Sequence, residues 1–211
     1  MDSMTLTTPR TLIDLVPRPS ARAHAVTHDV VWVVGFACLT ALLAQVRVNL
    51  SFTPVPITGQ TLGVLLAGTS LGLRRGVASQ SLYWVAGIFM PVAWYANDQT
   101  GSSIRDGWNH ATGTTAGYLF GFVVAAAAIG YLAEQGQDRT LMTSVPAMLT
   151  STAIIYVFGA AWLAHDLAIP VATGDTNALA LGVTPFLLGD LIKLVLAGLF
   201  TPVAWRLADR R

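Results

Sequence analysis

Six long apolar stretches alternate with short polar segments along this chain. They cover roughly 30–48, 57–73, 77–95, 112–133, 141–164 and 184–206. Each reaches or approaches the about 17–25 apolar residues that an α-helix needs to cross a bilayer. Charged side chains make up 11% of the residues, against about 25% in ordinary soluble domains. The pattern predicts an all-α integral membrane protein with six transmembrane helices in a single bundle.

The polar ends of the chain divide it into three parts. Residues 1–29 contain Pro9, Pro17 and Pro19 and lack the apolar core of a cleavable signal peptide. We therefore expect a flexible N-terminal segment in the cytoplasm. Residues 30–206 form the predicted six-helix membrane domain, and residues 207–211 form a cytoplasmic C-terminal tail. No connecting segment is long enough to hold a soluble domain.

The arginines predict the orientation of the bundle. With six crossings, both chain ends and the second and fourth connections lie on the same side of the membrane. That side carries nine basic residues: Arg10, Arg18, Arg22, Arg74, Arg75, Arg139, Arg206, Arg210 and Arg211. The opposite side carries two, Arg47 and Arg105. Because basic residues favour the cytoplasmic side, both termini are predicted to be cytoplasmic, and loops 47–56, 96–111 and 166–183 to face outward. The arginines form no basic stripe, so we expect the lipid bilayer as a partner and no nucleic acid.

The single lysine of the chain lies inside the last apolar stretch. Lys193 follows Asp190 by three residues, which places both side chains on one face of a helix. An ionisable residue inside a membrane is unfavourable and usually marks a site or a pathway. Two interpretations are open: an ion pair that only joins helices, or a polar site for a ligand at membrane depth. We favour the second.

Other polar and aromatic residues gather at the predicted outer end. Thr58 and Gln60 open the second stretch, whereas Tyr95 and Asn97 follow the third. Aromatic residues at this depth are also typical of the belt that lies at a membrane surface without binding anything. Gly113, Gly117 and Gly121 recur at intervals of four, as do other small residues, and this spacing is typical of closely packed membrane helices.

The sequence lacks the motifs that are typical of several functional classes. The one cysteine, Cys38, and four scattered histidines provide no metal-binding spacing, so we expect neither a metal nor another cofactor. The chain has no Walker A loop, so any ATP must be hydrolysed by a partner. An intramembrane enzyme that uses His165 with Asp166, or His110, is an alternative, but no nucleophile accompanies these residues. We therefore expect a binding protein and not an enzyme.

Three motifs resemble the BioY family, the biotin-specific substrate-binding (S) components of energy-coupling factor (ECF) transporters. They are the segment from Pro54 through Thr58 and Gln60 to Gly68, the segment from Gly113 to Phe122, and the segment from Pro185 to Lys193. The resemblance implies a six-helix S-component fold in a prokaryotic-type cell membrane. It also implies high-affinity capture of biotin from outside. The implied partners are a transmembrane coupling protein of the EcfT/BioN type and ATPase subunits of the EcfA/BioM type.

The resemblance also assigns roles to single residues. Asp190, Lys193, Thr58, Gln60 and Tyr118 match motif positions that bind biotin, and we add Tyr95, Asn97, Asp98 and Arg105 of the outer loop. Ala37 and Ala41 match the small-residue motif with which S components dock on the coupling protein. The outer loop and the Gly113–Tyr118 segment depart from the usual family pattern. An S component for another vitamin, such as thiamine or riboflavin, is the nearest alternative, and either end of biotin could meet Asp190 and Lys193.

Overall fold

The computed structural model describes residues 10–90, 94–95 and 104–208. Its elements are the 3-10 helices η1 (Leu12–Leu15) and η2 (Thr184–Phe186), the strands β1 (Arg47–Val48) and β2 (Ile57–Thr58), and the helices α1 (Arg22–Ala44), α2 (Gln60–Phe89), α3 (Ile104–Thr112), α4 (Ala116–Glu134), α5 (Leu141–Asp166), α6 (Ala178–Gly182) and α7 (Leu187–Ala208). Among the described residues, four helical segments are long and apolar enough to cross a membrane: Arg22–Ala44, Ala116–Glu134, Leu141–Asp166 and Ala178–Ala208. Large apolar side chains such as Leu188 and Val157 point out of the bundle, 73% and 66% exposed. This is the surface expected of helices surrounded by lipid.

The second and third predicted stretches lie within one kinked element, α2. At Gly72 the backbone has φ 78°, a left-handed conformation that favours glycine. The N–H of Leu73 donates to Glu134 Oε1 at 2.8 Å, and a β-carbon on Gly72 would lie 2.6 Å from that oxygen. The part of α2 after the kink runs back along the part before it, so that Gln60 and Tyr83 meet in a hydrogen bond of 2.6 Å.

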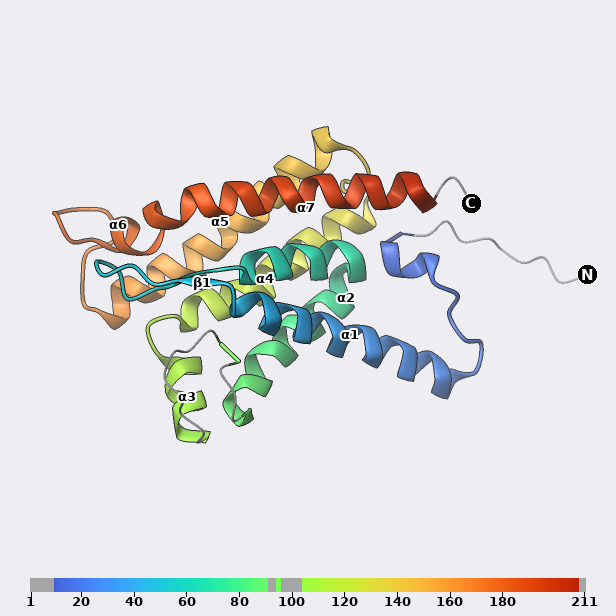
Figure 1. Cartoon of the computed structure of the whole chain (residues 1–211), viewed down its shortest axis with the longest axis horizontal. Helices are drawn as coiled ribbons and strands as arrows, with labels where there is room; N and C mark the ends of the chain where they lie inside the picture. The colour runs from blue at the N-terminus through green and yellow to red at the C-terminus, as the bar shows by residue number, and fades with distance from the viewer. Residues whose placement is uncertain (1–9, 91–93, 96–103, 209–211) are drawn as a thin grey trace, which may run out of the picture.

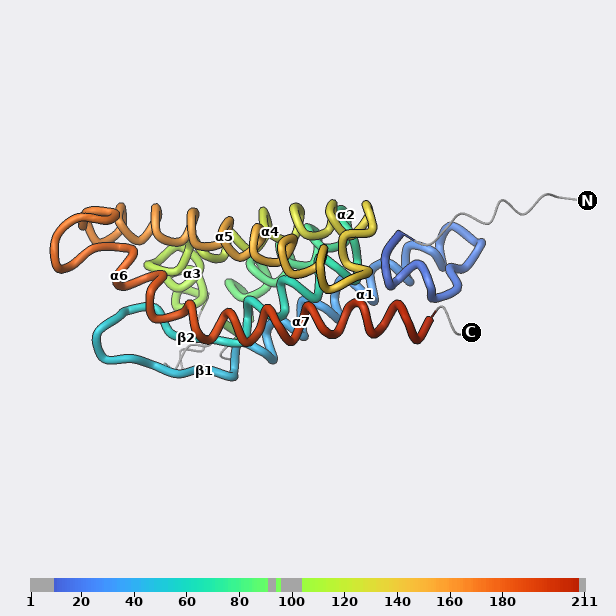
Figure 2. Tube along the Cα trace, turned by 90° about the horizontal axis from the view of Figure 1, so that it is seen from above, coloured from blue at the N-terminus to red at the C-terminus, as the bar shows by residue number. Residues whose placement is uncertain are grey.

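Helices α2 and α4 form the centre of the bundle. α2 packs against α1 and α4, α4 packs against α5, and α7 lies along α5 and α2 (Figures 1 and 2). α4 and α5 approach closely: a β-carbon on Gly117 would lie 2.5 Å from the Phe158 carbonyl oxygen, and one on Gly121 would lie 3.1 Å from Ile155 Cα. These two glycines therefore have the packing role that their spacing predicts.

The first helix begins earlier than the apolar pattern indicates. We expected the first span to start at residue 30 and residues 1–29 to lie outside the bundle, but α1 already begins at Arg22. η1 also packs on the bundle and buries Ile13 to 4% exposure. Arg75 pairs with Asp14 at 3.3 Å and with Asp29 at 3.0 Å, which ties η1, α1 and α2 together. Polar residues before residue 30 are thus part of the folded structure.

The all-α prediction is confirmed, and two details differ from the apolar pattern. The predicted fourth stretch, 112–133, forms a helix only from Ala116, because α3 ends at Thr112 and α4 starts four residues later. Gly113 therefore lies outside the helix that carries Gly117 and Gly121. Arg47 also pairs with Thr58, and Val48 with Ile57, in a short antiparallel ladder.

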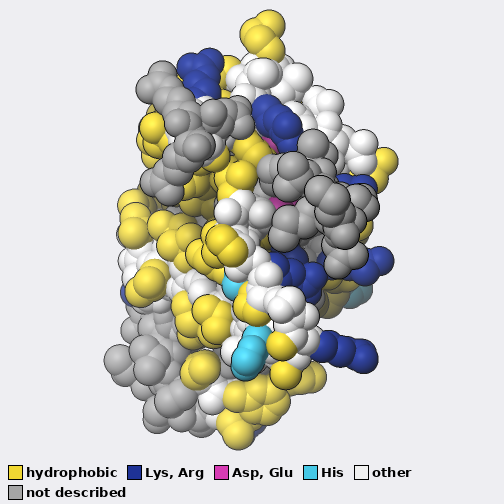
Figure 3. Space-filling model, turned by 90° about the vertical axis from the view of Figure 1, so that its right-hand side faces the viewer, with side chains coloured by type: hydrophobic (Ala, Val, Ile, Leu, Met, Phe, Trp, Pro, Cys, Tyr) yellow, Lys and Arg dark blue, Asp and Glu magenta, His cyan; other side chains and the backbone are white. Residues whose placement is uncertain are grey.

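The two described ends of the chain lie at the same end of the bundle (Figure 1). η1, the kink of α2, the α4–α5 connection and the end of α7 gather there. α6 and the loop between β1 and β2 lie at the opposite end, joined by a hydrogen bond of 2.6 Å from Thr53 Oγ1 to the Leu181 carbonyl. Figure 3 looks onto the first end and shows basic side chains over it. Arg74, Arg75, Arg139 and Arg206 belong to elements that meet there.

Candidate ligand-binding site

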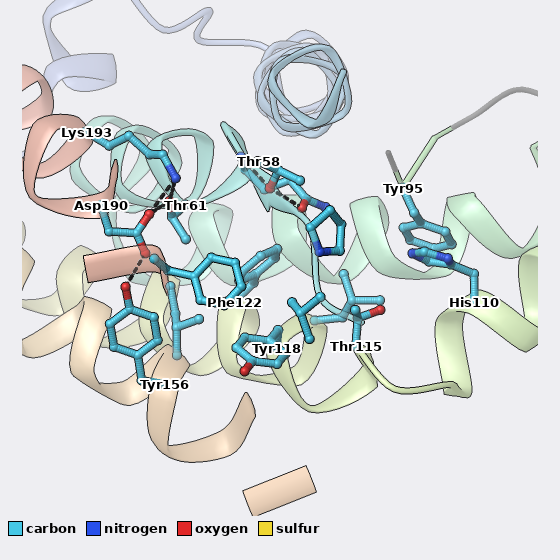
Figure 4. Close-up of a pocket in the computed structure, with 16 residues that line it drawn as sticks. Thr58, Thr61, Tyr95, His110, Thr115, Tyr118, Phe122, Tyr156, Asp190 and Lys193 are labelled. Carbon is cyan, nitrogen blue, oxygen red and sulfur yellow. Dashed lines mark hydrogen bonds and ion pairs between the residues drawn. The ribbon is translucent and has the colours of Figure 1, made fainter. Parts of the chain in front are cut away.

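A pocket lies among α2, α4, α5 and α7, beneath the β1–β2 loop (Figure 4). The pocket is partly open at its mouth, and the empty space within it, counted together with that opening, is about 560 Å³. Apolar and aromatic side chains make up most of the wall, and a few polar groups project into it. The lining residues are Val55, Pro56, Thr58, Gln60, Thr61, Tyr95, His110, Thr115, Tyr118, Leu119, Phe122, Ile155, Tyr156, Phe186, Asp190 and Lys193.

Asp190 and Lys193 form the charged end of this pocket. Lys193 Nζ lies 2.5 Å from Asp190 Oδ1, and the two side chains are 15% and 7% exposed. Thr61 Oγ1 donates to the same carboxylate oxygen at 2.9 Å and accepts from Lys193 Nζ at 3.2 Å. Tyr156 Oη donates to the other oxygen, Oδ2, at 2.6 Å. Three helices thus contribute to one polar cluster: α2, α5 and α7 (Figure 4).

The hydrogen bonds within this cluster leave specific donor and acceptor positions open to a ligand. A carboxylate has about four acceptor positions, and an ammonium group has three donors. Asp190 uses two positions on Oδ1 and one on Oδ2, whereas Lys193 uses two donors. With respect to the residues that the structure describes, one acceptor position on Asp190 and one N–H of Lys193 remain. Since the two charges cancel, the cluster suits a neutral ligand group that has a donor beside an acceptor.

Thr58 and Gln60 line the pocket but are bonded mainly to the protein. Thr58 Oγ1 donates to Gln60 Oε1 at 2.5 Å, and Gln60 Nε2 donates to Tyr83 Oη at 2.6 Å. Tyr83 Oη in turn donates to the Trp94 carbonyl at 3.2 Å. This chain of hydrogen bonds joins the beginning of α2 to its end. We infer that Gln60 shapes the wall of the pocket and holds Thr58 in place.

Tyr118 presents its ring to the pocket. Its hydroxyl donates to the Gly182 carbonyl at 2.7 Å, and a β-carbon on Gly159 would lie 2.2 Å from its ring. Two glycines thus make room for this side chain, on α5 and at the end of α6. Because the hydroxyl is already bonded, Tyr118 offers a ligand an apolar surface rather than a hydrogen bond.

Tyr95 and His110 lie at the opposite end of the pocket from Lys193 (Figure 4). Their rings stack with centroids 5.0 Å apart and planes at 13°. The Tyr95 hydroxyl donates to the Trp84 carbonyl. The pocket is therefore elongated, with a charged cluster at one end and stacked aromatic rings at the other.

The predicted site residues fall into three groups. Asp190, Lys193, Thr58, Gln60, Tyr118 and Tyr95 all line the pocket. Arg105 is exposed on α3 and does not line it, whereas Asn97 and Asp98 lie outside the described residues. Thr61, Tyr156 and Phe122 also line the pocket, although none of them was predicted as a site residue, and His110 was considered only as a catalytic group. Thr61 is next to the predicted Gln60, but no sequence signal distinguishes Tyr156.

A comparison with protein-family models matches residues 15–210 to the BioY family. The match covers most of the chain. The chain belongs to the BioY family. Among curated proteins, it is 34% identical to the "Biotin transporter BioY" of Rhizobium etli over 182 residues, which is 82% of this chain and 90% of that protein. It is 32% identical to the "Biotin transporter BioY" of Thermotoga maritima over 168 residues, 78% of this chain and 88% of that protein.

The BioY fold is supported independently by a solved structure. The crystal structure of the S-component for biotin from an ECF-type ABC transporter superposes with a TM-score of 0.70 at 18% identity. The superposition covers 89% of this chain and 95% of that one. The chain therefore has the fold of that S-component.

The BioY docking motif lies in an unexpected place. Ala37 is 1% exposed and Ala41 is 7% exposed, because α1 turns this face toward the bundle. Gly63 of α2 lets the two helices approach: a β-carbon on it would lie 2.9 Å from Thr40 Oγ1. In this structure the two alanines pack inside the bundle, and their docking role remains a prediction.

The described part of this BioY chain holds no group of three or more His, Cys, Asp or Glu side chains that could bind a metal ion. The polar groups that this pocket offers a ligand are two charged side chains and neighbouring hydroxyls, beside aromatic faces.

Proposed function

We propose that this chain is the biotin-binding membrane component of an ECF transporter, which captures biotin from outside and delivers it inward with an ATP-driven module. It lies in the cell membrane and crosses it six times, with the two parts of α2 as separate crossings and both termini in the cytoplasm. The main observation that supports this proposal is the pocket, in which the ion pair of Asp190 and Lys193 lies beside aromatic walls. Membership of the BioY family supports biotin as the ligand.

The charged cluster supports one orientation of biotin. The ureido ring has a C=O beside an N–H, which match the free N–H of Lys193 and the free acceptor position of Asp190. The valerate carboxylate would instead meet the negative Asp190 in a cluster with no net charge. The ureido ring therefore binds at Asp190 and Lys193, and the apolar thiolane lies against Tyr118 and Phe122. The carboxylate points toward the end formed by Tyr95 and His110.

Transport requires partners in this proposal. The chain has no Walker A loop with which to hydrolyse ATP. We propose a transmembrane coupling protein of the EcfT/BioN type and ATPase subunits of the EcfA/BioM type. The site itself needs no cofactor, since its polar groups already complement a urea.

The purified chain is expected to bind one biotin without ATP or metal. Titration calorimetry in detergent, with and without EDTA, measures this directly, and thiamine and riboflavin serve as competitors. Unchanged affinity in EDTA and no competition are the expected results. The absence of both binding heat and thermal stabilisation at saturating biotin would contradict the assignment of biotin as the ligand. Displacement of biotin by thiamine or riboflavin would indicate that the site binds that vitamin instead.

Two analogues test the proposed orientation. Methylation of both ureido nitrogens removes the donor that faces Asp190, so affinity is expected to fall at least about tenfold, in line with hydrogen bonds to charged groups. Biotin methyl ester keeps the ureido ring and is expected to lose less. The measurement is the dissociation constant of each analogue by competition. The reverse order of losses would place the carboxylate at Asp190 and Lys193.

A further inference from the structure

Tyr156 contacts the central carboxylate of the site from a helix that none of the three recognised motifs includes. It lies on α5, and its hydroxyl donates to Asp190 Oδ2 at 2.6 Å (Figure 4). Lys193 and Thr61 both donate to the other oxygen of Asp190, Oδ1. Tyr156 therefore controls the oxygen that still has room for a ligand.

The number of acceptor positions on Asp190 decides which ligand group fits. With Tyr156 in place, Oδ2 can accept one further hydrogen bond, and Oδ1 is filled. A neutral urea needs one acceptor for its N–H and finds its donor on Lys193. A cationic cyclic guanidine binds a carboxylate best through two parallel hydrogen bonds to both oxygens. Because Lys193 and Thr61 fill Oδ1, Asp190 cannot bind a guanidine in that way, and such a group can reach only Oδ2, which Tyr156 already contacts.

The effect of Tyr156 on the charge of Asp190 also favours a neutral ligand group over a cationic one. The Tyr156 hydroxyl donates to a buried carboxylate, and such a bond stabilises the negative charge of Asp190 and reduces its attraction for a further cation. Without this donor, Asp190 would have two open positions on Oδ2 and a less stabilised charge. Both changes favour a positively charged ligand group over a neutral one.

We infer that Tyr156 is a positioning residue that sets the selectivity of this site for a neutral cyclic urea over a cationic cyclic guanidine. The inference rests on the proposed function, because it takes the ureido end of biotin as the group that meets Asp190. A purely structural role is the competing explanation, since the same hydrogen bond also joins α5 to α7. A structural role would weaken the binding of all ligands by the same factor, whereas the positioning role changes the ratio between ligands.

The test compares biotin with 2-iminobiotin, its cyclic guanidine analogue, which is protonated at neutral pH. Dissociation constants for both are measured on the parent and on Tyr156→Phe in the same detergent. Biotin affinity is expected to fall about tenfold, as for a lost hydrogen bond to a charged group. The loss for 2-iminobiotin is expected to be smaller, so that the ratio of the two constants moves at least about fivefold toward the guanidine. Tyr131→Phe is the matched control, because Tyr131 lies on α4 and is 54% exposed.

Each outcome is informative. An equal loss for both ligands, or no loss, contradicts the inference while leaving the proposed function intact. Failure of the parent to bind biotin contradicts the proposed function itself. If Tyr156→Phe does not stay monodisperse, 3,5-difluorotyrosine at position 156 replaces it, measured at a pH at which the phenol remains protonated. This more acidic donor is expected to move the ratio away from the guanidine, and a shift toward it overturns the inference.

Discussion

Replacing Asp190 by Asn and Lys193 by Met together is expected to weaken biotin binding at least about 30-fold, which corresponds to about 2 kcal/mol. The double variant removes both charges at once and keeps the approximate size of each side chain. The cluster then has no ammonium donor for the urea carbonyl and no carboxylate for its N–H. Because no unpaired charge is left inside the bundle, the variant is expected to stay folded.

Single substitutions at this pair are less informative. Removing one partner of a buried ion pair typically destabilises a protein by about 3–5 kcal/mol, so loss of binding could follow from loss of folding. The control is Arg18→Met, which removes an ion pair of 2.5 Å near the start of α1, remote from the pocket, and leaves Asp29 paired with Arg75. Calorimetry and size-exclusion chromatography compare both variants with the parent. A monodisperse Asp190→Asn, Lys193→Met protein with parental affinity would show that the pair only joins helices.

The sequence predicted the membrane-embedded elements well but not their ends. Apolar runs report where side chains can face lipid, and they identified the regions of α1, α4, α5 and α7. They do not report where a helix continues among polar residues. The start of α1 was missed because Arg22–Asp29 is polar, and ion pairs with Arg75 hold part of this region on the bundle. The kink of α2 depends on Gly72, whose left-handed backbone no hydropathy pattern reveals.

The site was predictable as far as its residues lie close in sequence. Asp190 and Lys193 are one helical turn apart, and Thr58 and Gln60 belong to a single segment. Tyr156 was not predictable, because its contact with Asp190 joins residues 34 apart on two packed helices. The stacking of His110 on Tyr95 likewise depends on how α3 folds back against the end of α2. Contacts of this kind follow from packing between helices rather than from any local pattern.

The helix face that carries Ala37 illustrates what a small-residue motif cannot predict, namely the identity of its packing partner. A spacing of four between small residues indicates that something packs closely there, but not whether it is a partner protein or the same chain. In the structure that neighbour is α2, and Ala37 belongs to the buried core together with Val64 and Ala41. The next residue, Cys38, is exposed on the other side of α1. The two positions therefore allow a direct comparison on one helix.

Ala37→Leu is expected to destabilise the purified protein by about 1–3 kcal/mol, the usual effect of added volume in a packed core. Cys38→Leu adds a similar bulk to an exposed position and is expected to leave thermal unfolding in detergent unchanged. If Ala37→Leu instead unfolds like the parent, binds biotin normally and fails only in uptake with the coupling module, then Ala37 meets the partner in the assembled transporter. In that case α1 must turn or move away from α2 when the module docks, since Ala37 is 1% exposed in the isolated chain. Unfolding, binding and uptake measured on the same pair of variants thus decide whether this face holds the bundle together or docks its partner.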